Sequence, residues 1–358
     1  MKIVTVVGAR PQFIKAAPVS EILRKSFREY IIHTGQHYDD NMSRIFFDDL
    51  QIPRPDINLN VGSGRHAEQT GRMLIEIERV LQQQKPDLLL VYGDTNSTFA
   101  GALCAAKLHI PIAHVEAGLR SFNRKMPEEI NRILTDQISA FLFCPTQTSV
   151  NHLKTEGVIG AIHLVGDVMY DAALKFGKIA ERKSTIMSKL GLKKNAFLLA
   201  TVHRPNSTDT AAHLGSIIEA FEESDENIVF PIHPRTRNFL QKYKLWDRVA
   251  GNPRIMNIDP VSYLDMLVLE KHAKKILTDS GGIQKEAYFY QIPCITMREE
   301  TEWVETVEDG WNIIVGTDKM AILRAIKDFN PNSKQRSLFG NGDASININQ
   351  ILVSALKS

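Results

Sequence analysis

The sequence contains few cysteines and no long apolar run. Three of its 358 residues are cysteine, at Cys104, Cys144 and Cys294, and they lie far apart among apolar neighbours. Such a set argues against a disulfide framework or a structural zinc site and is typical of free thiols in a reducing compartment. No apolar run approaches the roughly 20 residues that span a bilayer, and the run after Met1 is too short for a signal peptide. We therefore expect a cytoplasmic protein with no membrane segment.

The sequence also lacks a large excess of charge of either sign. It has 43 Lys and Arg against 41 Asp and Glu, a formal net charge of +2, without long runs of like charge. A binding face for nucleic acid is therefore not indicated. Hydrophobic residues make up 43% of the chain, which is ordinary for a globular protein, and 358 residues favour two domains over one.

Apolar runs of strand length alternate with longer stretches of helical period, which is typical of βα units around a parallel sheet. We expect an α/β protein with two Rossmann-like domains, 1–167 and 168–344, and a helix at about 345–358 that packs back on the first. The expected strands are 2–7, 30–34, 88–92, 112–115, 142–145, 162–165, 197–201, 228–231, 255–258, 275–278, 294–297 and 312–315. Ligands in open α/β sheets bind beyond the carboxyl ends of the strands, so the residues there are the candidates for function.

The first candidate segment, residues 8–15, follows the first strand and opens a helix. A tight turn at Gly8 would leave free backbone N–H groups at a helix N-terminus, which favours an anion. Arg10 could add a planar fork of donors, suited to a phosphate or the edge of a uracil. The alternative is a plain strand-to-helix turn in which Arg10 and Lys15 are solvated.

Two further strand ends carry carboxylates. Asp94 follows the strand 88–92, and Glu116 follows the strand 112–115. Because these strands should be neighbours, both carboxylates would face one crevice, where paired acids can hold different pKa values and divide acid and base work. The alternative is that Asp94 caps the next helix and that Glu116 pairs with Arg120.

A helix is expected from Pro127 to about residue 140, with acidic residues in its first turn. Glu128, Arg132 and Asp136 recur at four-residue spacing on one of its faces, either as a surface ladder of ion pairs or as the lining of a cleft. The polar loop 121–126 leads directly to Glu128, which favours the cleft for that residue.

In the second half, His203 and His233 follow two adjacent strands. A pair of histidines without a third ligand is not a zinc site, and we expect no metal. After the strand 275–278, the run 279–287 passes through a Ser-Gly-Gly turn into a helix. The Ser280 hydroxyl and the N–H groups that follow it would cradle a diphosphate, and Glu286 could accept both hydroxyls of a ribose.

Taken together, these segments resemble the non-hydrolysing UDP-N-acetylglucosamine 2-epimerase family over essentially the whole chain. The resemblance implies the glycosyltransferase-B arrangement of two Rossmann-like domains, with the UDP-sugar in the cleft between them. It also implies an isomerase that needs no cofactor and supplies precursors of surface polysaccharides. The implied reaction is an anti elimination of UDP to a 2-acetamidoglucal, followed by re-addition with inversion at C2. A homodimer is expected from the resemblance alone.

Residue roles follow from the same resemblance. Asp94, Glu116 and Glu128 would remove and return the C2 proton, and His203 would assist the departure of UDP. An unactivated C2–H is not acidic, so cations must stabilise the leaving diphosphate. Tyr263 would stack on uracil, and Glu286 would hold the ribose. The other residues expected to bind the UDP-sugar are Arg10, Lys15, Arg132, His233, Ser280, Gly281 and Gly282.

Two departures from the family pattern concern the substrate. The opening after the first strand has Gln12 where the family usually has Glu, and the segment 34–42 lacks an Arg common in bacterial members. Both variants resemble the branch that includes epimerases of UDP-2,3-diacetamido-2,3-dideoxyglucuronate, which is therefore the alternative substrate. Arg124 and Lys125, close to Glu128, could meet a uronate carboxylate. The second departure also argues against allosteric activation by UDP-N-acetylglucosamine.

Three other functions are weighed against this interpretation. A glycosyltransferase of the same fold would not need three carboxylates around C2. A hydrolysing epimerase has a different opening after its first strand. A UDP-sugar sensor without catalytic activity would keep the Ser280 turn but lose the acids, whereas this chain has both.

Overall fold

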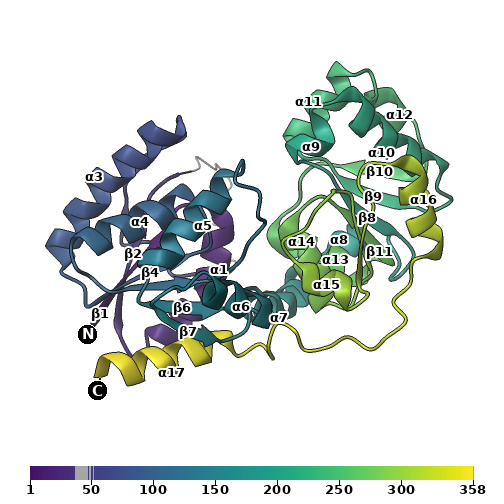
Figure 1. Cartoon of the computed structure of the whole chain (residues 1–358). Helices are drawn as coiled ribbons and strands as arrows, with labels where there is room; N and C mark the ends of the chain where they lie inside the picture. Colours follow the sequence, from purple (N-terminus) through teal and green to yellow (C-terminus); the bar gives the residue numbers. More distant parts are fainter. Residues whose placement is uncertain (37–46, 48–49, 51, 358) are drawn as a thin grey trace. The chain divides into compact units, whose positions relative to one another are not determined.

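The computed structural model describes residues 1–36, 47, 50 and 52–357 (Figure 1). These residues form two compact units: unit 1 comprises residues 1–175 and the stretch from Ser337 onward, and unit 2 comprises Phe176–Arg336. The sequence boundary of 167 and 168 precedes helix α7 (Val168–Lys183), whereas the units divide within that helix. The start of α7 belongs to unit 1 because Asp171 accepts hydrogen bonds from Ala344 N and from Ser345 N and Oγ, at 3.2, 2.7 and 2.6 Å.

Unit 1 is built on a parallel sheet of seven strands in the order β3-β2-β1-β4-β5-β6-β7. The strands are β1 (Lys2–Val7), β2 (Arg28–His33), β3 (Ile57–Asn58), β4 (Leu88–Tyr92), β5 (Ile112–Val115), β6 (Phe141–Cys144) and β7 (Ala161–Leu164). The central strands are almost wholly apolar because helices cover both faces of such a sheet. These helices are α1 (Arg10–Leu23), α3 (His66–Gln84), α4 (Asn96–Lys107), α5 (Pro127–Ile138), α6 (Gln147–Thr155), α7 and α17 (Ala344–Lys357).

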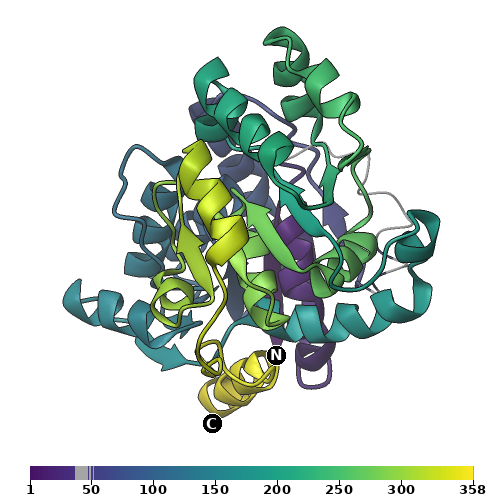
Figure 2. The same cartoon turned by 90° about the vertical axis from the view of Figure 1, so that its right-hand side faces the viewer.

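The core of unit 1 lies between the sheet and a layer of helices. Helices α3, α4 and α5 lie side by side in this layer, and α17 packs against α1 (Figures 1 and 2). Gly101 allows α4 to approach β1 closely, since a Cβ at this position would be 3.3 Å from Val6 Cγ2. In α17, Asn349 Nδ2 donates to Ser26 Oγ at 3.2 Å.

Unit 2 has a parallel sheet of six strands in the order β10-β9-β8-β11-β12-β13. The strands are β8 (Leu198–Thr201), β9 (Ile228–Pro231), β10 (Ile255–Ile258), β11 (Lys275–Thr278), β12 (Cys294–Thr296) and β13 (Asn312–Ile314). The helices are α8 (Ile186–Lys189), α9 (Pro205–Thr208), α10 (Ala211–Glu223), α11 (Pro234–Lys242), α12 (Trp246–Ala250), α13 (Tyr263–His272), α14 (Gly281–Phe289), α15 (Val304–Glu308) and α16 (Lys319–Asp328). Its core joins β8, β9 and β11 to α10 and α16.

All the expected strands are confirmed, with small shifts at their ends, and so is the α/β fold class. Strand β3 was not expected. In both sheets the strand order reverses beside the first strand of the unit, between β1 and β4 and between β8 and β11. Ligand sites in doubly wound sheets lie at such switch points. The loops and helices that follow these four strands carry the candidate residues Arg10, Lys15, Asp94, His203, Ser280, Gly281, Gly282 and Glu286.

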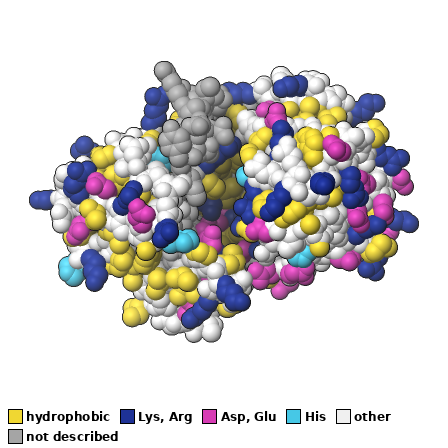
Figure 3. All heavy atoms as spheres, turned by 90° about the horizontal axis from the view of Figure 1, so that it is seen from above, with side chains coloured by type: hydrophobic (Ala, Val, Ile, Leu, Met, Phe, Trp, Pro, Cys, Tyr) yellow, Lys and Arg dark blue, Asp and Glu magenta, His cyan; other side chains and the backbone are white. Residues whose placement is uncertain are grey.

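On the face shown in Figure 3, basic and acidic side chains are interspersed over both units. Within the described ranges, no helix is both long and apolar enough to cross a membrane.

Candidate active site

The turn after β1 is closed by a buried glutamine. Gln12 Oε1 accepts from the backbone N–H groups of Gly8 and Ala9, at 2.7 and 3.2 Å, while its Nε2 donates to Tyr92 O at 2.7 Å and to Thr98 Oγ1 at 3.0 Å. The expectation that these two N–H groups are free for an anion is therefore wrong. Residue 8 must be glycine, since a Cβ would lie 1.9 Å from the hydroxyl of the residue at 97. The turn locks β1 to β4.

Glu116 at the end of β5 pairs with Lys15 of α1, so the alternatives of a solvated lysine and of a Glu116–Arg120 pair are both wrong. The two side chains are 6% and 16% exposed. Glu116 has φ of 71°, a conformation unusual for a side chain larger than glycine and common where function stores strain. Gly93 leaves room for the pair, because a Cβ there would be 3.2 Å from Glu116 Oε2 and 3.5 Å from Lys15 Nζ.

Asp94 at the end of β4 pairs with Arg132 of α5, with 2.6 Å between Oδ2 and Nη2. The N-cap of α4 is Thr95, so the interpretation of Asp94 as a helix cap is wrong. Burial raises the pKa of the Asp94 carboxyl, the Arg132 and Lys15 cations lower it, and the negative Glu116 and Glu128 raise it again. These electrostatic contacts bring the three predicted carboxylates and the two cations together in unit 1.

Beneath this group lies a buried network that the sequence analysis did not identify. Asp136 is fully buried and binds His114 Nδ1 at 2.7 Å, Gly118 N at 3.1 Å and Arg120 Nη1 at 2.7 Å. His114 Nε2 donates to Gly93 O at 2.7 Å, since a carbonyl oxygen only accepts. The network holds the ends of β4 and β5 in place.

A surface ladder of Glu128, Arg132 and Asp136 is excluded. Arg132 is 4% exposed and Asp136 is fully buried, and each pairs with a residue outside α5. Glu128 is half-buried in the first turn of α5. Arg10, also half-buried, is the first residue of α1.

In unit 2, Asp279 fixes the turn after β8. Its carboxylate accepts from His203 N at 2.9 Å and Arg204 N at 2.8 Å, and His203 Nδ1 lies 3.2 Å from Oδ1. Burial alone would raise the pKa of Asp279, but the hydrogen bonds and charge of His203, with the Arg204 N–H, lower it on balance. The ring centroids of His203 and His233 are 5.7 Å apart, so the two strand ends do meet. Burial, reinforced by His203 and Arg235, lowers the pKa of His233.

The Ser-Gly-Gly turn forms the start of α14. Ser280 is the N-cap, its N–H donates to Thr278 Oγ1 at 2.9 Å, and within the described chain its side chain caps no N–H of the helix. Gly281 is the first helical residue, and a loop that follows β12 closes around it. Three residues of this loop, Arg298, Glu302 and Trp303, were missed by sequence reasoning.

Glu286 and Tyr263 lie against each other in unit 2. The Tyr263 hydroxyl donates to Glu286 Oε1 at 3.0 Å, and the Tyr263 ring packs edge-on against Phe176 with centroids 5.9 Å apart. Burial, the nearby Glu286 and other acidic groups raise the pKa of Tyr263 well above its usual value. The phenol is therefore a hydrogen-bond donor that orients Glu286. Stacking of the ring on uracil stays a prediction.

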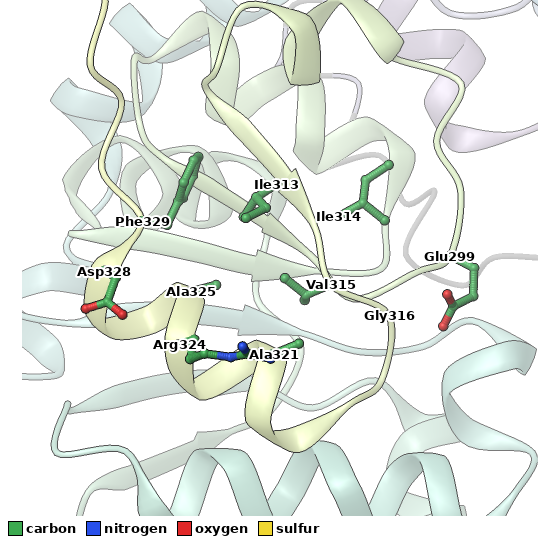
Figure 4. A pocket seen from close by; sticks show the side chains of 10 residues that line it. All are labelled: Glu299, Ile313, Ile314, Val315, Gly316, Ala321, Arg324, Ala325, Asp328 and Phe329. Atoms are coloured by element: carbon green, nitrogen blue, oxygen red, sulfur yellow. The ribbon is translucent and has the colours of Figure 1, made fainter.

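A pocket of about 540 Å³ lies elsewhere in unit 2, beside β13 and α16 (Figure 4). Arg324, Asp328 and Phe329 line it, and it contains none of the predicted site residues. Among the described residues, no group of three or more His, Cys, Asp or Glu side chains is arranged to hold a metal ion. Of the predicted segment 34–42, residues from 37 onward lie outside the described part of the chain.

The two groups of residues suit different chemistry. The group in unit 1 holds carboxylates beside cations, with a raised pKa at Asp94, which is an arrangement for moving protons at neutral pH. The group in unit 2 offers a helix N-terminus and the two neighbouring histidines, which is an arrangement for binding and stabilising an anion.

Comparisons with known proteins identify the family. Residues 21–353 match the family model described as UDP-N-acetylglucosamine 2-epimerase. A UDP-N-acetylglucosamine 2-epimerase homolog from Methanococcus maripaludis is 58% identical, covering 98% of this chain and 99% of that protein. The UDP-2,3-diacetamido-2,3-dideoxy-D-glucuronate 2-epimerase of Pseudomonas aeruginosa is 49% identical, and the match covers 98% of this chain and 99% of that protein.

A solved structure matches the whole chain. The crystal structure of Methanocaldococcus jannaschii UDP-GlcNAc 2-epimerase in complex with UDP-GlcNAc and UDP superposes with a TM-score of 0.90 and 47% identity, covering 99% of this chain and all of that one. With a family model that spans most of the chain and near-full-length relatives at this identity, the chain belongs to the UDP-N-acetylglucosamine 2-epimerase family.

Proposed function

We propose that the protein is a non-hydrolysing epimerase that interconverts UDP-N-acetylglucosamine and UDP-N-acetylmannosamine, without a cofactor. The observation that carries the proposal is the group of three carboxylates in unit 1, two of them in contact with cations. The match to a relative crystallised with UDP-GlcNAc and UDP supports the choice of substrate.

The reaction is an elimination followed by an addition. A carboxylate removes the C2 proton while the C1–O bond to UDP breaks, and the electrons of the C–H bond form the C1–C2 double bond of a 2-acetamidoglucal. UDP then re-adds at C1, and an acid protonates C2 on the opposite face. Asp94, Glu116 and Glu128 are the proposed acids and bases, because removal and return of the proton on two faces require more than one group.

Charge develops on the diphosphate as it leaves. The N-terminus of α14, formed by Ser280, Gly281 and Gly282, and the nearby His203 are the groups proposed to stabilise that charge. Glu286, oriented by Tyr263, is proposed to accept from the ribose hydroxyls, and Tyr263 to contact uracil. The other proposed UDP-sugar contacts are Arg10, Lys15, Arg132 and His233.

We further propose a homodimer that works in the cytoplasm and feeds polysaccharide synthesis. Large apolar side chains exposed on α3 and α5 support a partner surface on unit 1: Ile75 is 68% exposed, Ile130 47% and Leu134 42%. Light scattering should report twice the mass of the 40.3 kDa chain, and a monomer would contradict the dimer.

The reaction is tested by proton NMR with UDP-N-acetylglucosamine in deuterated water. We expect a manno epimer with deuterium at C2, and losses of at least about 100-fold in rate for Asp94→Asn and Glu116→Gln. Glu68→Gln is the matched control, because Glu68 is exposed and its ion pair among the described residues is with Arg72 of its own helix. Absence of exchange and of epimerisation, in a protein that still binds UDP, would refute the epimerase and leave a transferase or a sensor.

A second substrate is favoured by two observations. The Pseudomonas aeruginosa relative, 49% identical, acts by its name on a diacetamido-glucuronate, and Arg124 and Lys125 are exposed just before α5 and Glu128. These cations suit a carboxylate at C6 of the sugar. Turnover of the two UDP-sugars, measured side by side in the same NMR experiment, decides between them.

A further inference from the structure

The loop 298–303, between β12 and α15, is held tightly on the first turns of α14. Thr301 Oγ1 donates to Gln284 Oε1 at 2.6 Å, and the ammonium of Lys285 lies 4.0 Å from the centroid of the Trp303 ring. Gln284 is fully buried and Lys285 is 2% exposed. Because these contacts are made by buried side chains on α14, the loop has a defined position relative to the start of that helix.

This position brings an arginine to Gly281. A Cβ on Gly281 would lie 3.4 Å from Glu302 Oε2, 3.5 Å from Trp303 Nε1 and 4.0 Å from Arg298 Nη1. The polar ends of all three side chains therefore face the first residue of α14. Substrate binding at this helix N-terminus would place the diphosphate among them.

Arg298 is also pre-oriented. Its Nη1 and Nη2 donate to Glu302 Oε2 and Oε1 at 3.1 and 3.0 Å, a bidentate pair with side chains 9% and 11% exposed. Each Nη carries two N–H groups, and the pair uses only one of each. Arg298 thus keeps donors for a second anion while Glu302 holds its plane, and holding the plane reduces the entropy cost of binding.

We propose that Arg298 binds the diphosphate of the UDP-sugar and that Glu302 acts as its positioning residue. This inference rests on the proposed function, which places the diphosphate at the N-terminus of α14. The guanidinium adds charge-assisted hydrogen bonds to the N–H groups of the helix, so Arg298 contributes to binding of UDP and to stabilisation of UDP as it leaves.

The test compares UDP with uridine, which lacks the diphosphate. Affinities of the full-length protein are measured by calorimetry for UDP and by ligand-observed NMR for uridine. Arg298→Gln should lose about 10- to 100-fold in affinity for UDP, the usual worth of hydrogen bonds to charged groups, and keep its affinity for uridine. Arg298→Lys should lose less affinity for UDP, because lysine keeps the positive charge but not the planar pair of N–H donors. The affinity of Glu302→Gln for UDP should lie between those of wild type and Arg298→Gln.

Two further variants keep the test decisive. The double variant, with Arg298→Gln and Glu302→Gln, removes both charges and leaves no uncompensated half-buried carboxylate. It should therefore fold and still lose affinity for UDP but not for uridine. Arg324→Gln, an arginine of the same unit that lines the pocket beside β13, is the matched control and should bind UDP as wild type does.

The outcomes separate the two proposals. If wild-type protein binds no UDP, the proposed function fails. If wild type binds UDP and the double variant binds it equally well, the role of Arg298 is refuted while the proposed function stands. Equal losses for UDP and uridine would also refute it, because they would show that the loop only supports the fold of unit 2.

Discussion

Replacing Arg132 with glutamine tests whether the Asp94–Arg132 pair sets the pH range of the enzyme. Gln keeps an N–H donor for Asp94 but removes the positive charge that lowers the pKa of the Asp94 carboxyl. Burial, the largest influence, and the carboxylates of Glu116 and Glu128 raise that pKa and would then be opposed only by Lys15. The pKa of Asp94 should therefore rise further above the ordinary value of an aspartate.

The size of the shift follows from the geometry. With 2.6 Å between Oδ2 and Nη2, the two charge centres are roughly 4 Å apart, and two unit charges at that distance interact by about 1 kcal/mol in water and about 4 kcal/mol near a protein surface. The Asp94 side chain is 33% exposed and that of Arg132 is 5% exposed, so a value between these limits applies. At about 1.4 kcal/mol per pKa unit, we expect an upward shift of about one to two units.

The assay is the rate of deuterium incorporation at C2 of UDP-N-acetylglucosamine, measured from pH 5 to 10. If Asp94 acts as a base, the acid limb of the kcat/KM profile moves upward in Arg132→Gln; if it acts as an acid, the alkaline limb does. Arg132→Lys should restore the wild-type position. Arg72→Gln, which removes an exposed cation in unit 1, should leave both limbs in place. A profile with neither limb moved would show that Asp94 does not control the reaction.

Three further predictions concern stability. Gln12→Glu should lower the free energy of unfolding by about 2–4 kcal/mol at pH 8, because a carboxylate cannot donate to Tyr92 O and Thr98 Oγ1 as Gln12 does. The pKa of the new carboxyl would be raised in the folded protein, so the loss of stability should be smaller at pH 5, and urea titrations at the two pH values check this. Gly118→Ala should lower the free energy of unfolding by at least about 3 kcal/mol, since φ is 79° and the Cβ would lie 2.4 Å from Ser149 O. Gly157→Ala is the control: its φ is 66° but nothing lies near the Cβ position, so the same assay should show a loss of about 1 kcal/mol. Burial lowers the pKa of His33 from 6.5 to about 4, so the unfolded chain binds this proton more readily, and the free energy of unfolding should fall as the pH is lowered from 6.5 towards 4. The free energy of unfolding of His33→Gln should fall less over this range, and an equal fall in both proteins would refute the assignment.

The strands were predictable because they are short apolar runs, most of which lead into Gly, Asp, Glu or Thr in the first half of the chain. Strand β3 was not, since Ile57 and Asn58 form a pattern too short to recognise and pair only through the backbone of β2. The division of α7 between the units was also hidden, because it depends on Asp171 binding residues near 345 rather than on any break in the helical period.

The positions of Asp94 and Glu116 at the ends of β4 and β5 were predictable from the sequence. Their partners were not, because Lys15 is 101 residues away from Glu116 and Arg132 is 38 away from Asp94 in the sequence. The local alternatives, such as Asp94 as a helix cap, were equally consistent with the residue pattern. Arg298 was missed for a related reason. The acidic residues that follow it in the sequence are typical of a solvated loop, and only the structure shows that this loop is held on α14 by the hydrogen bond from Thr301 to Gln284 and that the Arg298 side chain is 9% exposed.

The charges of the two groups of residues suit the different roles proposed for them, proton transfer in unit 1 and stabilisation of the leaving diphosphate in unit 2. In unit 1, Lys15 and Arg132 each pair with a carboxylate, and Glu128 adds a further negative charge, so the three carboxylates outnumber these two cations. In unit 2, burial lowers the pKa of His233, which favours its neutral form, and the α14 N-terminus contributes about half a charge. Arg298 is also paired with a carboxylate, that of Glu302, but it keeps donors at the start of α14, where the proposed reaction develops negative charge. For this reason its loss should slow the departure of UDP as well as weaken its binding.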